Sequence, residues 1–287
     1  MSSSRTIKLT LQYDGARFCG WQSQRDARTV QGELAGAVER MVRRPIELVG
    51  AARTDSGVHA IGQVASFATT SSIPCRNFVS GLNRYLPRDV AVTQAEDVEV
   101  DFSARFSALG KWYRYSFFTS NSRDVFADRY AWRVAQTLDL EAMRTAASGL
   151  VGEHDFVAFA TRSKSPPATT VRSVHAVEVS ASARFFFVDV IGRGFLYNMV
   201  RIMAGTLYEV GRGKRSADSL GAALASCDRR QAGTTAEPQG LCLREVFYDQ
   251  ERLQAAIVEC RQARPIDRSG PFCYPANRTL SSDSIEG

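Results

Sequence analysis

The chain has few of the residues that build metal sites and disulfide scaffolds. Its 287 residues include three histidines and six cysteines, and no two cysteines form a C-x-x-C pair. Structural zinc sites need cysteine and histidine ligands at short, regular spacings, and disulfide scaffolds are short and dense in cysteine. We therefore expect a reduced protein without a metal site, whose stability comes from an apolar core.

Long apolar runs are also missing. No stretch approaches the about 20 apolar residues of a membrane-spanning helix, and the N-terminal Met-Ser-Ser-Ser-Arg lacks the apolar core of a signal peptide. These features predict a cytoplasmic protein without a membrane partner. The hydrophobic content of 44% and the charged content of 23% are ordinary for a soluble globular protein.

Basic residues exceed acidic ones. The formal net charge is +6, and the isoelectric point is about 9.1. This balance permits a polyanionic partner such as a nucleic acid, but a basic soluble enzyme without such a partner has the same composition. Charge alone leaves both alternatives open.

Hydrophobic periodicity predicts two similar halves. Alternating apolar residues indicate strands, and a spacing of three to four residues indicates helices. The first half is predicted to contain, in order, a strand at 6–13, a helix that Thr29 caps and Pro45 ends, strands at 46–52 and 63–69, a helix from Pro74 to Leu86 and a strand at 90–92. The second half is predicted to contain a strand at 112–119, a helix at 140–150, strands at 171–180 and 184–191, a helix at 196–210, a shorter helix after Ser216 and a strand at 241–248.

The order in each half is β-α-β-β-α-β, which is the ferredoxin-like arrangement. We therefore predict an α+β fold in which two ferredoxin-like repeats join their sheets side by side, with helices packed on one face and an active-site cleft between the halves. The expected divisions are residues 1–104, residues 105–249 and a partly disordered C-terminal extension at 250–287. The polar segment 161–170 contains two adjacent prolines and is predicted to be a mobile loop.

The segment GAARTDSGVHA, residues 50–60, is longer than the two-residue turn of a tight hairpin. Arg53 and Asp55 are two residues apart, so in an extended chain they point the same way. In one interpretation Asp55 only forms a turn, accepting backbone hydrogen bonds while Gly57 supplies a positive φ. Asp55-Ser56-Gly57 also resembles the D-[ST]-G of aspartic proteases, but those enzymes need two such aspartates, and this chain has one such motif.

Five motifs, in order, resemble those of the tRNA pseudouridine synthase A family. Segment 50–60 resembles the family's GxGRTDxGVHA, with Ala52 where the family usually has glycine. The others are YDGARFCGWQ at 13–22, FSARFSALGKWYRY at 102–115, GFLYNMVRIMAGTLYEVG at 194–211 and GLCLREVFY at 240–248. Five ordered motifs are far more specific than any one of them, and together they cover nearly the whole chain.

This resemblance implies the isomerisation of uridine to pseudouridine in the anticodon stem-loop of tRNA, at positions 38–40, by a homodimer that needs no cofactor or metal. It implies that Asp55 is the catalytic nucleophile, which either adds to C1′ or removes a C2′ proton. It further implies that Arg201 pairs with Asp55 and keeps it ionised and oriented.

The resemblance also gives roles to three residues that bind the substrate. Tyr113 stacks on the target uracil, and Leu243 with Leu241 supplies an apolar wall for it. The target base lies in a helical stem and must leave the stack, so the planar guanidinium of Arg53 fills the gap or holds the adjacent phosphate.

Simpler interpretations stand beside these roles. Tyr113 and Leu243 can be core residues, as we prefer for Phe117, and His59 is taken as structural. Arg201 lies roughly 150° from the centre of the apolar stripe of its helix, so it can also be a solvent-exposed arginine. The candidate phosphate contacts, each of which can instead be a solvated surface charge, are Arg17, Arg25, Arg105, Lys111, Arg114, Arg162 and Lys164.

The alternative function is a non-catalytic RNA-binding module, because ferredoxin-like folds with exposed aromatics bind single-stranded bases. The RNP1 signature of such modules is not found in the chain. Release of tritium from uridine C5 separates the two hypotheses, since only pseudouridine formation breaks that bond.

Overall fold

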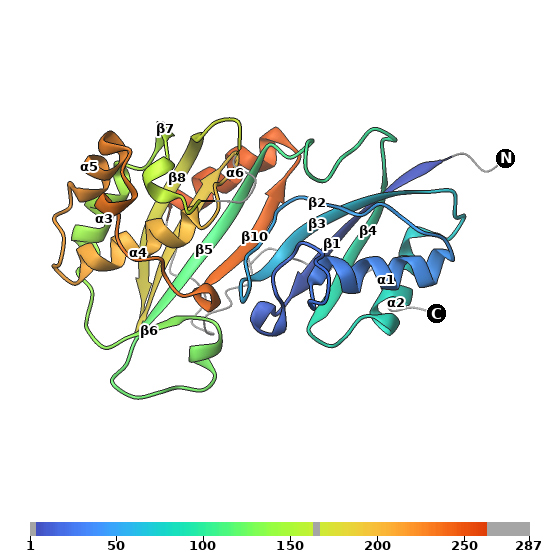
Figure 1. The fold of residues 1–287 in the computed structure, drawn as a ribbon, viewed down its shortest axis with the longest axis horizontal. Helices are drawn as coiled ribbons and strands as arrows, with labels where there is room; N and C mark the ends of the chain where they lie inside the picture. The colour runs from blue at the N-terminus through green and yellow to red at the C-terminus, as the bar shows by residue number, and fades with distance from the viewer. Residues whose placement is uncertain (1–3, 163–166, 263–287) are drawn as a thin grey trace.

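One mixed sheet runs through the molecule. The computed structural model describes residues 4–162 and 167–262. Within these residues the sheet has ten strands in the order β4-β1-β3-β10-β5-β9-β8-β7, while β2 pairs with β3 and β6 pairs with β5. Figure 1 shows the N-terminal and C-terminal halves side by side along this sheet. The predicted α+β class is confirmed.

The N-terminal half follows the ferredoxin-like order. Its elements are β1 (Arg5–Tyr13), α1 (Val30–Val42), β2 (Val49–Gly50), β3 (His59–Thr69), α2 (Cys75–Tyr85) and β4 (Val90–Val98). Thr29 caps α1 as predicted, because its side chain accepts a hydrogen bond from the amide of Gly32. The predicted boundary at residue 104 falls in the connection between β4 and β5.

The C-terminal half repeats this order with additions. Its elements are β5 (Gly110–Thr119), β6 (Trp132–Val134), α3 (Leu140–Ser148), β7 (Gly152–Asp155), β8 (Val171–Ser182), β9 (Phe185–Gly192), α4 (Met199–Gly211), α5 (Ser219–Ser226), β10 (Leu241–Phe247) and α6 (Gln250–Arg261). Its central strands lie in the order β10-β5-β9-β8, which corresponds to β4-β1-β3-β2 of the first half. The prediction of two ferredoxin-like repeats is therefore confirmed. Short 3₁₀ helices lie at Gly15–Arg17, Ala127–Arg129, Val157–Phe159, Arg229–Gln231 and Pro238–Gly240.

The two halves join at one edge of β3. The start of this edge pairs in parallel with β10, through His59 with Cys242 and Ala60 with Leu243. Further along, the same edge pairs with β2. The predicted strand at 46–52 is wrong in length: β2 has only two residues, and beyond it the side chain of Gln63, in place of the β3 backbone, bonds both the amide and the carbonyl of Ala52. The chain instead leaves the sheet after β2, and residues 51–58 form a loop at the junction.

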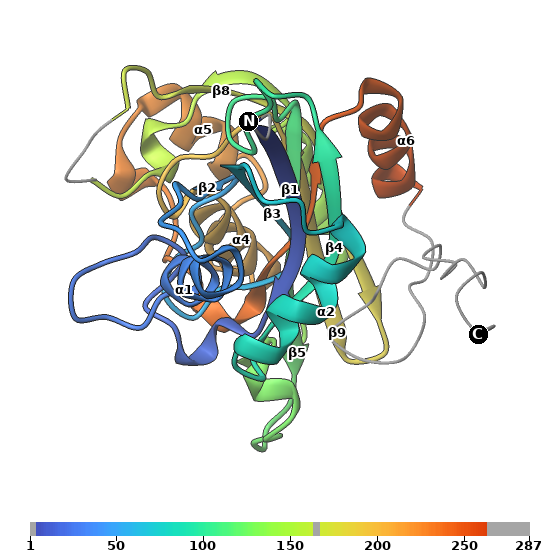
Figure 2. The ribbon, with the colours of Figure 1, turned by 90° about the vertical axis from the view of Figure 1, so that its right-hand side faces the viewer.

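Helices cover both faces of the sheet. In Figure 2, α1, α4 and α5 lie on one side of the strands and α6 lies on the other. A large apolar core fills the side of α1 to α5, and a smaller one forms around Trp112 of β5, Ile191 of β9 and Leu253 of α6. We predicted helices on one face only, and α6 adds a second layer. No helix in the described part of the chain is both long and apolar enough to span a membrane.

The described part of the predicted C-terminal extension contains α6. This helix begins after Asp249, whose side chain accepts a hydrogen bond from the amide of Arg252. The rest of the extension, residues 263–287, lies outside the described residues, as does the middle of the predicted loop at 161–170.

Candidate active site

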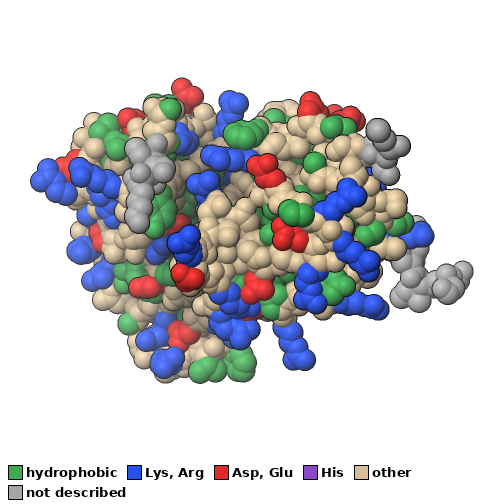
Figure 3. Space-filling view, turned by 45° about the vertical axis from the view of Figure 1, so that its right-hand side comes forward, with side chains coloured by type: hydrophobic (Ala, Val, Ile, Leu, Met, Phe, Trp, Pro, Cys, Tyr) green, Lys and Arg blue, Asp and Glu red, His purple; other side chains and the backbone are tan. Residues whose placement is uncertain are grey.

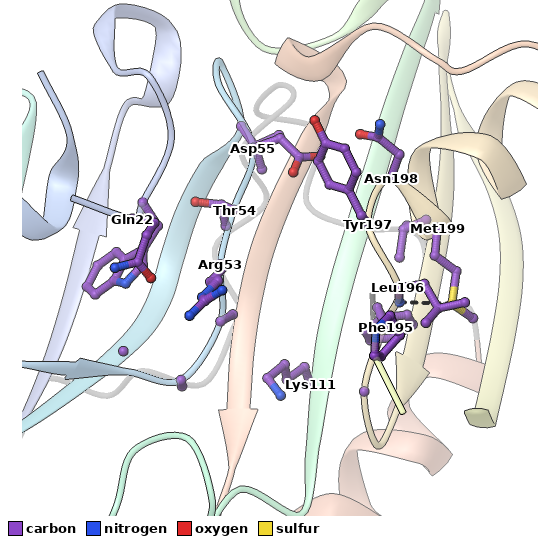
Figure 4. A pocket seen from close by; sticks show the side chains of 18 of the residues that line it. Gln22, Arg53, Thr54, Asp55, Lys111, Phe195, Leu196, Tyr197, Asn198 and Met199 are labelled. Carbon is purple, nitrogen blue, oxygen red and sulfur yellow. Dashed lines mark hydrogen bonds between the residues drawn. The ribbon is translucent and has the colours of Figure 1, made fainter. Parts of the chain in front are cut away.

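A cleft of about 1520 Å³ is lined by both halves of the molecule. The N-terminal half contributes the 51–58 loop, and the C-terminal half contributes Tyr113, Lys111 and the segment 194–201. In Figure 4 Asp55 lies on one side of the cleft and Asn198 on the other. This volume exceeds the roughly 300–1,000 Å³ that is typical of small-molecule pockets.

The outer side of the 51–58 loop packs against the segment that follows β1. Trp21 N donates to Thr54 O at 3.0 Å, and Gly57 N donates to Phe18 O at 3.4 Å. Gly20 has a φ of 90°, and a Cβ atom there would lie 2.7 Å from Thr54 O. Only glycine fits this backbone conformation and this approach. The YDGARFCGWQ motif therefore shapes the loop.

The buried side of the loop is held by two polar side chains. The hydroxyls of Tyr13 and Thr54 lie 2.7 Å apart. Gln63 Nε2 donates to Ala52 O at 2.8 Å, and its Oε1 accepts from Ala52 N at 3.2 Å. Thr54 thus faces inward, and the residues on either side of it turn toward the cleft, as the alternation of an extended chain predicts.

Asp55 presents its carboxylate to α4. Its Oδ2 lies 3.5 Å from Nη1 of Arg201. The turn itself is closed by the main chain, because Val58 N donates to Asp55 O at 3.2 Å, and Gly57 has the expected positive φ of 79°. Among the described residues no backbone amide donates to the carboxylate of Asp55. A turn-forming role therefore explains Gly57 but not the Asp55 side chain.

The environment of Asp55 shifts its titration. Burial raises the pKa of Asp55 above its ordinary value, and the adjacent charge of Arg201 opposes this shift without cancelling it. The effect of Arg201 therefore has the predicted sign, but burial is the larger cause. A cation beside the carboxylate is also the opposite of the second carboxylate with which an aspartic protease shares a proton.

Arg201 lies on a helix that is buried on nearly all sides. Its side chain is only 15% exposed, so the interpretation as a solvent-exposed arginine is wrong. Its Nε donates to Ala236 O at 2.8 Å, and Ala236 N donates to Arg201 O at 3.1 Å. These contacts to the 234–238 segment leave Nη1 directed to Asp55.

Tyr113 projects from β5 into the cleft. Its ring meets Phe195 edge to face, with the ring centroids 5.3 Å apart. Burial raises the pKa of Tyr113 well above its ordinary value, and the charge of Asp55 adds to this shift. The phenol is therefore neutral at physiological pH. Phe117, four residues further along the same strand, is fully buried. It is therefore a core residue, which is the interpretation that we preferred.

The apolar wall of the cleft differs from the one predicted. Leu241 lines the cleft, whereas Leu243 is fully buried and lies outside its lining. The structure thus places Leu243 in the strand core, the simpler of its two interpretations. Arg53 is exposed in the cleft and makes no hydrogen bond or ion pair with any described residue, which leaves its guanidinium available to a substrate (Figure 4).

The candidate phosphate contacts separate into groups. Arg105, Lys111 and Arg162 line the cleft. Arg17 pairs with Asp89, Arg25 is exposed outside the cleft lining, and Lys164 lies outside the described residues. Figure 3 shows Lys and Arg side chains on both sides of a central hollow, with acidic side chains among them.

Arg114 is not a phosphate contact, which corrects the prediction. It is 6% exposed, and its Nη2 lies 2.7 Å from Oδ2 of Asp189, whose Oδ1 also accepts from Trp112 Nε1. Successive residues of a strand point to opposite faces, so Arg114 faces away from the cleft that Tyr113 lines.

His59 lies behind the 51–58 loop rather than in the cleft. Its Nδ1 accepts from Gly15 N at 3.1 Å and lies 3.3 Å from Oδ1 of Asp14. Its ring also meets Tyr130 edge to face, with the centroids 5.2 Å apart. These contacts fit the structural role that we assigned to it.

Comparison with known proteins explains this arrangement. The family model described as tRNA pseudouridine synthase matches residues 10–107 and 146–249, which include the 51–58 loop and the segment 194–201, while Lys111 and Tyr113 of β5 lie between the two matched ranges. The chain belongs to this family. Pseudouridine synthases are isomerases, and the sequence resemblance to them is thereby confirmed.

Curated relatives of this family align with most of the chain. The tRNA pseudouridine synthase A of Syntrophotalea carbinolica is 48% identical over 242 residues, covering 84% of this chain and 96% of that protein. That of Geobacter sp. (strain M21) is 46% identical over 245 residues, covering 85% and 99%. That of Moorella thermoacetica is 46% identical over 244 residues, covering 84% and 99%. A solved Cbf5-Nop10-Gar1 complex contains a chain with 10% identity and a TM-score of 0.33, covering 82% of this chain and 57% of that chain, and adds no further support.

Several cleft residues of this pseudouridine synthase family member are absent from the predicted site. They are Phe106, Arg172, Phe195, Tyr197 and Asn198. Phe106 is 79% exposed, and it follows a predicted phosphate contact in the sequence. Asn198 stands directly before a strongly periodic helix, where asparagine is typical of a helix cap. That position was the available signal for Asn198, and its contacts depend on residues distant in sequence.

Proposed function

We propose that the protein isomerises uridine to pseudouridine in the anticodon stem-loop of tRNA, at positions 38–40, with Asp55 as the nucleophile. Family membership supports pseudouridine formation in tRNA. The observation that most supports Asp55 is its place at the cleft wall, with Arg201 Nη1 3.5 Å away and no backbone amide of the described chain engaging its carboxylate.

The reaction conserves the atoms of the nucleoside. The N1–C1′ bond breaks, the uracil turns over, and a C5–C1′ bond forms. The C5 hydrogen leaves to water, and N1 gains a proton. A carboxylate supports this exchange either by adding to C1′ and leaving again or by removing and returning a C2′ proton. Arg201 stabilises the charged carboxylate in either case.

Tyr113 binds the uracil as it turns. Its ring is fixed by Phe195 and faces the cleft, so it offers a flat surface beside the nucleophile. Because its phenol is neutral, the hydroxyl acts as a hydrogen-bond donor and not as an anionic base. Arg53 enters the space that the base leaves or contacts the neighbouring phosphate, as a planar cation can.

We further propose, from the family resemblance, that the protein works in the cytoplasm as a homodimer. The cations on both sides of the cleft favour recognition of the RNA mainly through its phosphates and its shape, since A-form RNA exposes little sequence in its grooves. Sedimentation equilibrium of the purified protein tests the dimer, which would have twice the mass of the 31.6 kDa chain.

The substitution Asp55→Asn tests the catalytic assignment. Asparagine keeps the size and the backbone preferences of aspartate, but an amide is neither a carboxylate nucleophile nor a base. We expect the variant to fold and to bind tRNA as the wild type does, and to release no tritium from uridine C5. The measurement is single-turnover tritium release, with tRNA binding measured on the same preparation.

The matched control is Asp101→Asn, which removes a negative charge from an exposed position outside the cleft lining. It should release tritium at the wild-type rate. Release by Asp55→Asn within about tenfold of the wild type, roughly 1.4 kcal/mol in the barrier, would remove Asp55 from the mechanism. Binding without release by the wild type would instead favour the non-catalytic RNA-binding module.

A further inference from the structure

Asn198 holds an unusual backbone conformation at the wall of the cleft. It directly precedes α4 with a φ of 62° and a ψ of 5°, and its side chain does not cap the helix. Non-glycine residues rarely adopt this left-handed region, and asparagine is among those that tolerate it best. Such outliers persist where the surrounding structure holds them, often at functional sites.

The amide of Asn198 bridges two segments. Its Oδ1 accepts a hydrogen bond from Arg201 Nη1 at 2.9 Å, and its Nδ2 donates to Thr161 Oγ1 at 3.1 Å. The amide of Thr161 donates in turn to Tyr197 O at 3.1 Å. The orientation of the amide is fixed by its partners, because the guanidinium can only donate.

The contact with Arg201 involves the same nitrogen that faces Asp55. Nη1 of Arg201 lies 2.9 Å from Asn198 Oδ1 and 3.5 Å from Asp55 Oδ2, while Nε is held by Ala236 O. The guanidinium is therefore fixed at two points, and its approach to the carboxylate follows from them. At 3.5 Å the ion pair is too long to orient Arg201 by itself.

We propose that Asn198 is a positioning residue, which aims the guanidinium of Arg201 at Asp55 and is itself held by Thr161 on the rim of the cleft. The catalytic part of this role rests on the proposed function. Asn198 touches neither Asp55 nor the uracil, and it acts through Arg201. The left-handed backbone is what brings its amide between α4 and Thr161, since it turns the chain directly before the helix.

Arg201 approaches Asp55 from α4, and Tyr113 of β5 and Arg53 of the loop itself line the same cleft. The other charged or titratable groups in the cleft lining are Cys19, Glu47, Arg105, Lys111, Arg162, Arg172, Tyr197, Cys227, Asp228 and Arg229. Tyr113 is neutral, because burial raises its pKa, and Arg53 is exposed to solvent. Loss of the Asn198 contact therefore acts on Asp55 mainly through Arg201, whose charge is the one that lowers the pKa of this carboxyl.

The test compares Asn198→Gly with the wild type. Glycine adopts the same φ without strain, so the variant removes the amide and keeps the turn. Ala183→Gly is the matched control, because Ala183 also has a positive φ of 52° and lies in the turn between β8 and β9. Thr161→Val is a second variant, which leaves the Asn198 contact to Arg201 but removes the hydroxyl that orients the amide.

Two measurements are made on each full-length protein. The first is the titration of the Asp55 carboxyl by carbon NMR in the absence of RNA, and the second is tritium release at saturating tRNA. In Asn198→Gly we expect the pKa of Asp55 to rise, the rate to fall about tenfold and tRNA affinity to stay within about twofold. Thr161→Val should change in the same direction by less, and Ala183→Gly should match the wild type.

An unchanged titration of Asp55 in Asn198→Gly overturns the proposal. If that variant does not fold, the titration of Thr161→Val decides in the same way. The NMR result is independent of turnover, so a wild-type protein that releases no tritium contradicts the proposed function and leaves the positioning of Arg201 to be decided by the titration.

Discussion

Asp55 combines a reactive group with an unfavourable environment. Burial opposes its ionised form, while the proposed reaction requires that form. Arg201 offsets only part of this cost. Catalytic sites commonly hold such destabilised groups, and replacing them often makes the fold more stable.

The stability of Asp55→Asn should therefore depend on pH. Because the pKa of Asp55 is raised in the folded state, the stability linked to its proton is fully present below the unfolded-state pKa and is lost as pH rises through the folded-state pKa. Asparagine has no proton to lose. We expect the variant to melt above the wild type at pH 7, by roughly 2–4 °C for each kcal/mol of relieved burial. The difference should vanish below about pH 3, where aspartate is protonated in both states.

Thermal unfolding at both pH values checks this expectation. Arg201 keeps two partners in the variant, Ala236 O and Asn198 Oδ1, so it is not left unpaired. A variant that melts below the wild type at pH 7 would show that the ion pair outweighs the burial of the carboxylate.

The roles of single residues differ in how well the sequence alone predicts them. Asp55 and Arg201 lie 146 positions apart in sequence, and a family motif at each position was sufficient to predict their contact. Arg114 was misassigned from its charge, although alternation with Tyr113 places it on the opposite face of β5. Asn198 was missed because its role depends on the position of Thr161, which no local pattern reports.

At the level of elements, the 51–58 loop depends on a neighbour that is distant in sequence from Asp55. The segment after β1 meets the loop closely at two glycines, Gly15 against Val58 O and Gly20 against Thr54 O. The loop therefore owes its shape less to its own residues than to the fit of two backbone segments.

The substitution Gly20→Ala should disrupt this fit. The new Cβ would lie 2.7 Å from Thr54 O, at a φ of 90°, so the loop must move. We expect a loss of about 1–3 kcal/mol in the free energy of unfolding, together with a loss of turnover larger than the loss of tRNA binding. Denaturant unfolding and tritium release measure the two effects.

Gly36→Ala is the matched control. Gly36 lies within α1, and a Cβ there meets nothing within 4 Å, so alanine should stabilise the protein by up to about 1 kcal/mol and leave turnover unchanged. Equal effects of the two substitutions would mean that the close approach at Gly20 does not shape the loop.

Most elements were predictable because their periodicity is local. Strands and helices with continuous apolar patterns, such as β1 and α4, occur close to the predicted positions. The length of β2 was not predictable, because the backbone of Ala52 is bonded by the side chain of Gln63 instead of by the β3 backbone, and no local pattern reports this contact. For α6 a signal existed, since Leu253, Ala256, Ile257 and Cys260 follow helical spacing and are buried against the sheet.

At the scale of the whole molecule, cations line both sides of the cleft, among them Arg53 from the N-terminal half and Lys111 from the C-terminal half (Figure 3). Phosphate contacts release counterions, so binding weakens steeply as salt increases. We expect tRNA affinity to fall by at least about tenfold between roughly 50 and 200 mM salt. Arg105→Gln should reduce the slope of log K against log salt by about one.

Arg76→Gln is the control for this experiment. Arg76 is exposed on α2 and lies outside the cleft lining, so its loss should leave the slope unchanged. An affinity that does not depend on salt would show that phosphate contacts contribute little to tRNA binding. Equal slopes for Arg105→Gln and the wild type would show the same for the contact at Arg105.

The division of the β3 edge has a consequence for biosynthesis. β3 ends at Thr69, whereas its partner β10 begins at Leu241, so the ribosome must make most of the chain before that edge closes. At about 5–20 residues per second, the edge stays open for on the order of ten seconds. Unpaired strand edges recruit other chains. A nascent chain released before Leu241 lacks β10, so the edges of β3 and β5 that pair with β10 stay open. Such a chain already contains the Asp55 loop but not the junction of the two halves beside it.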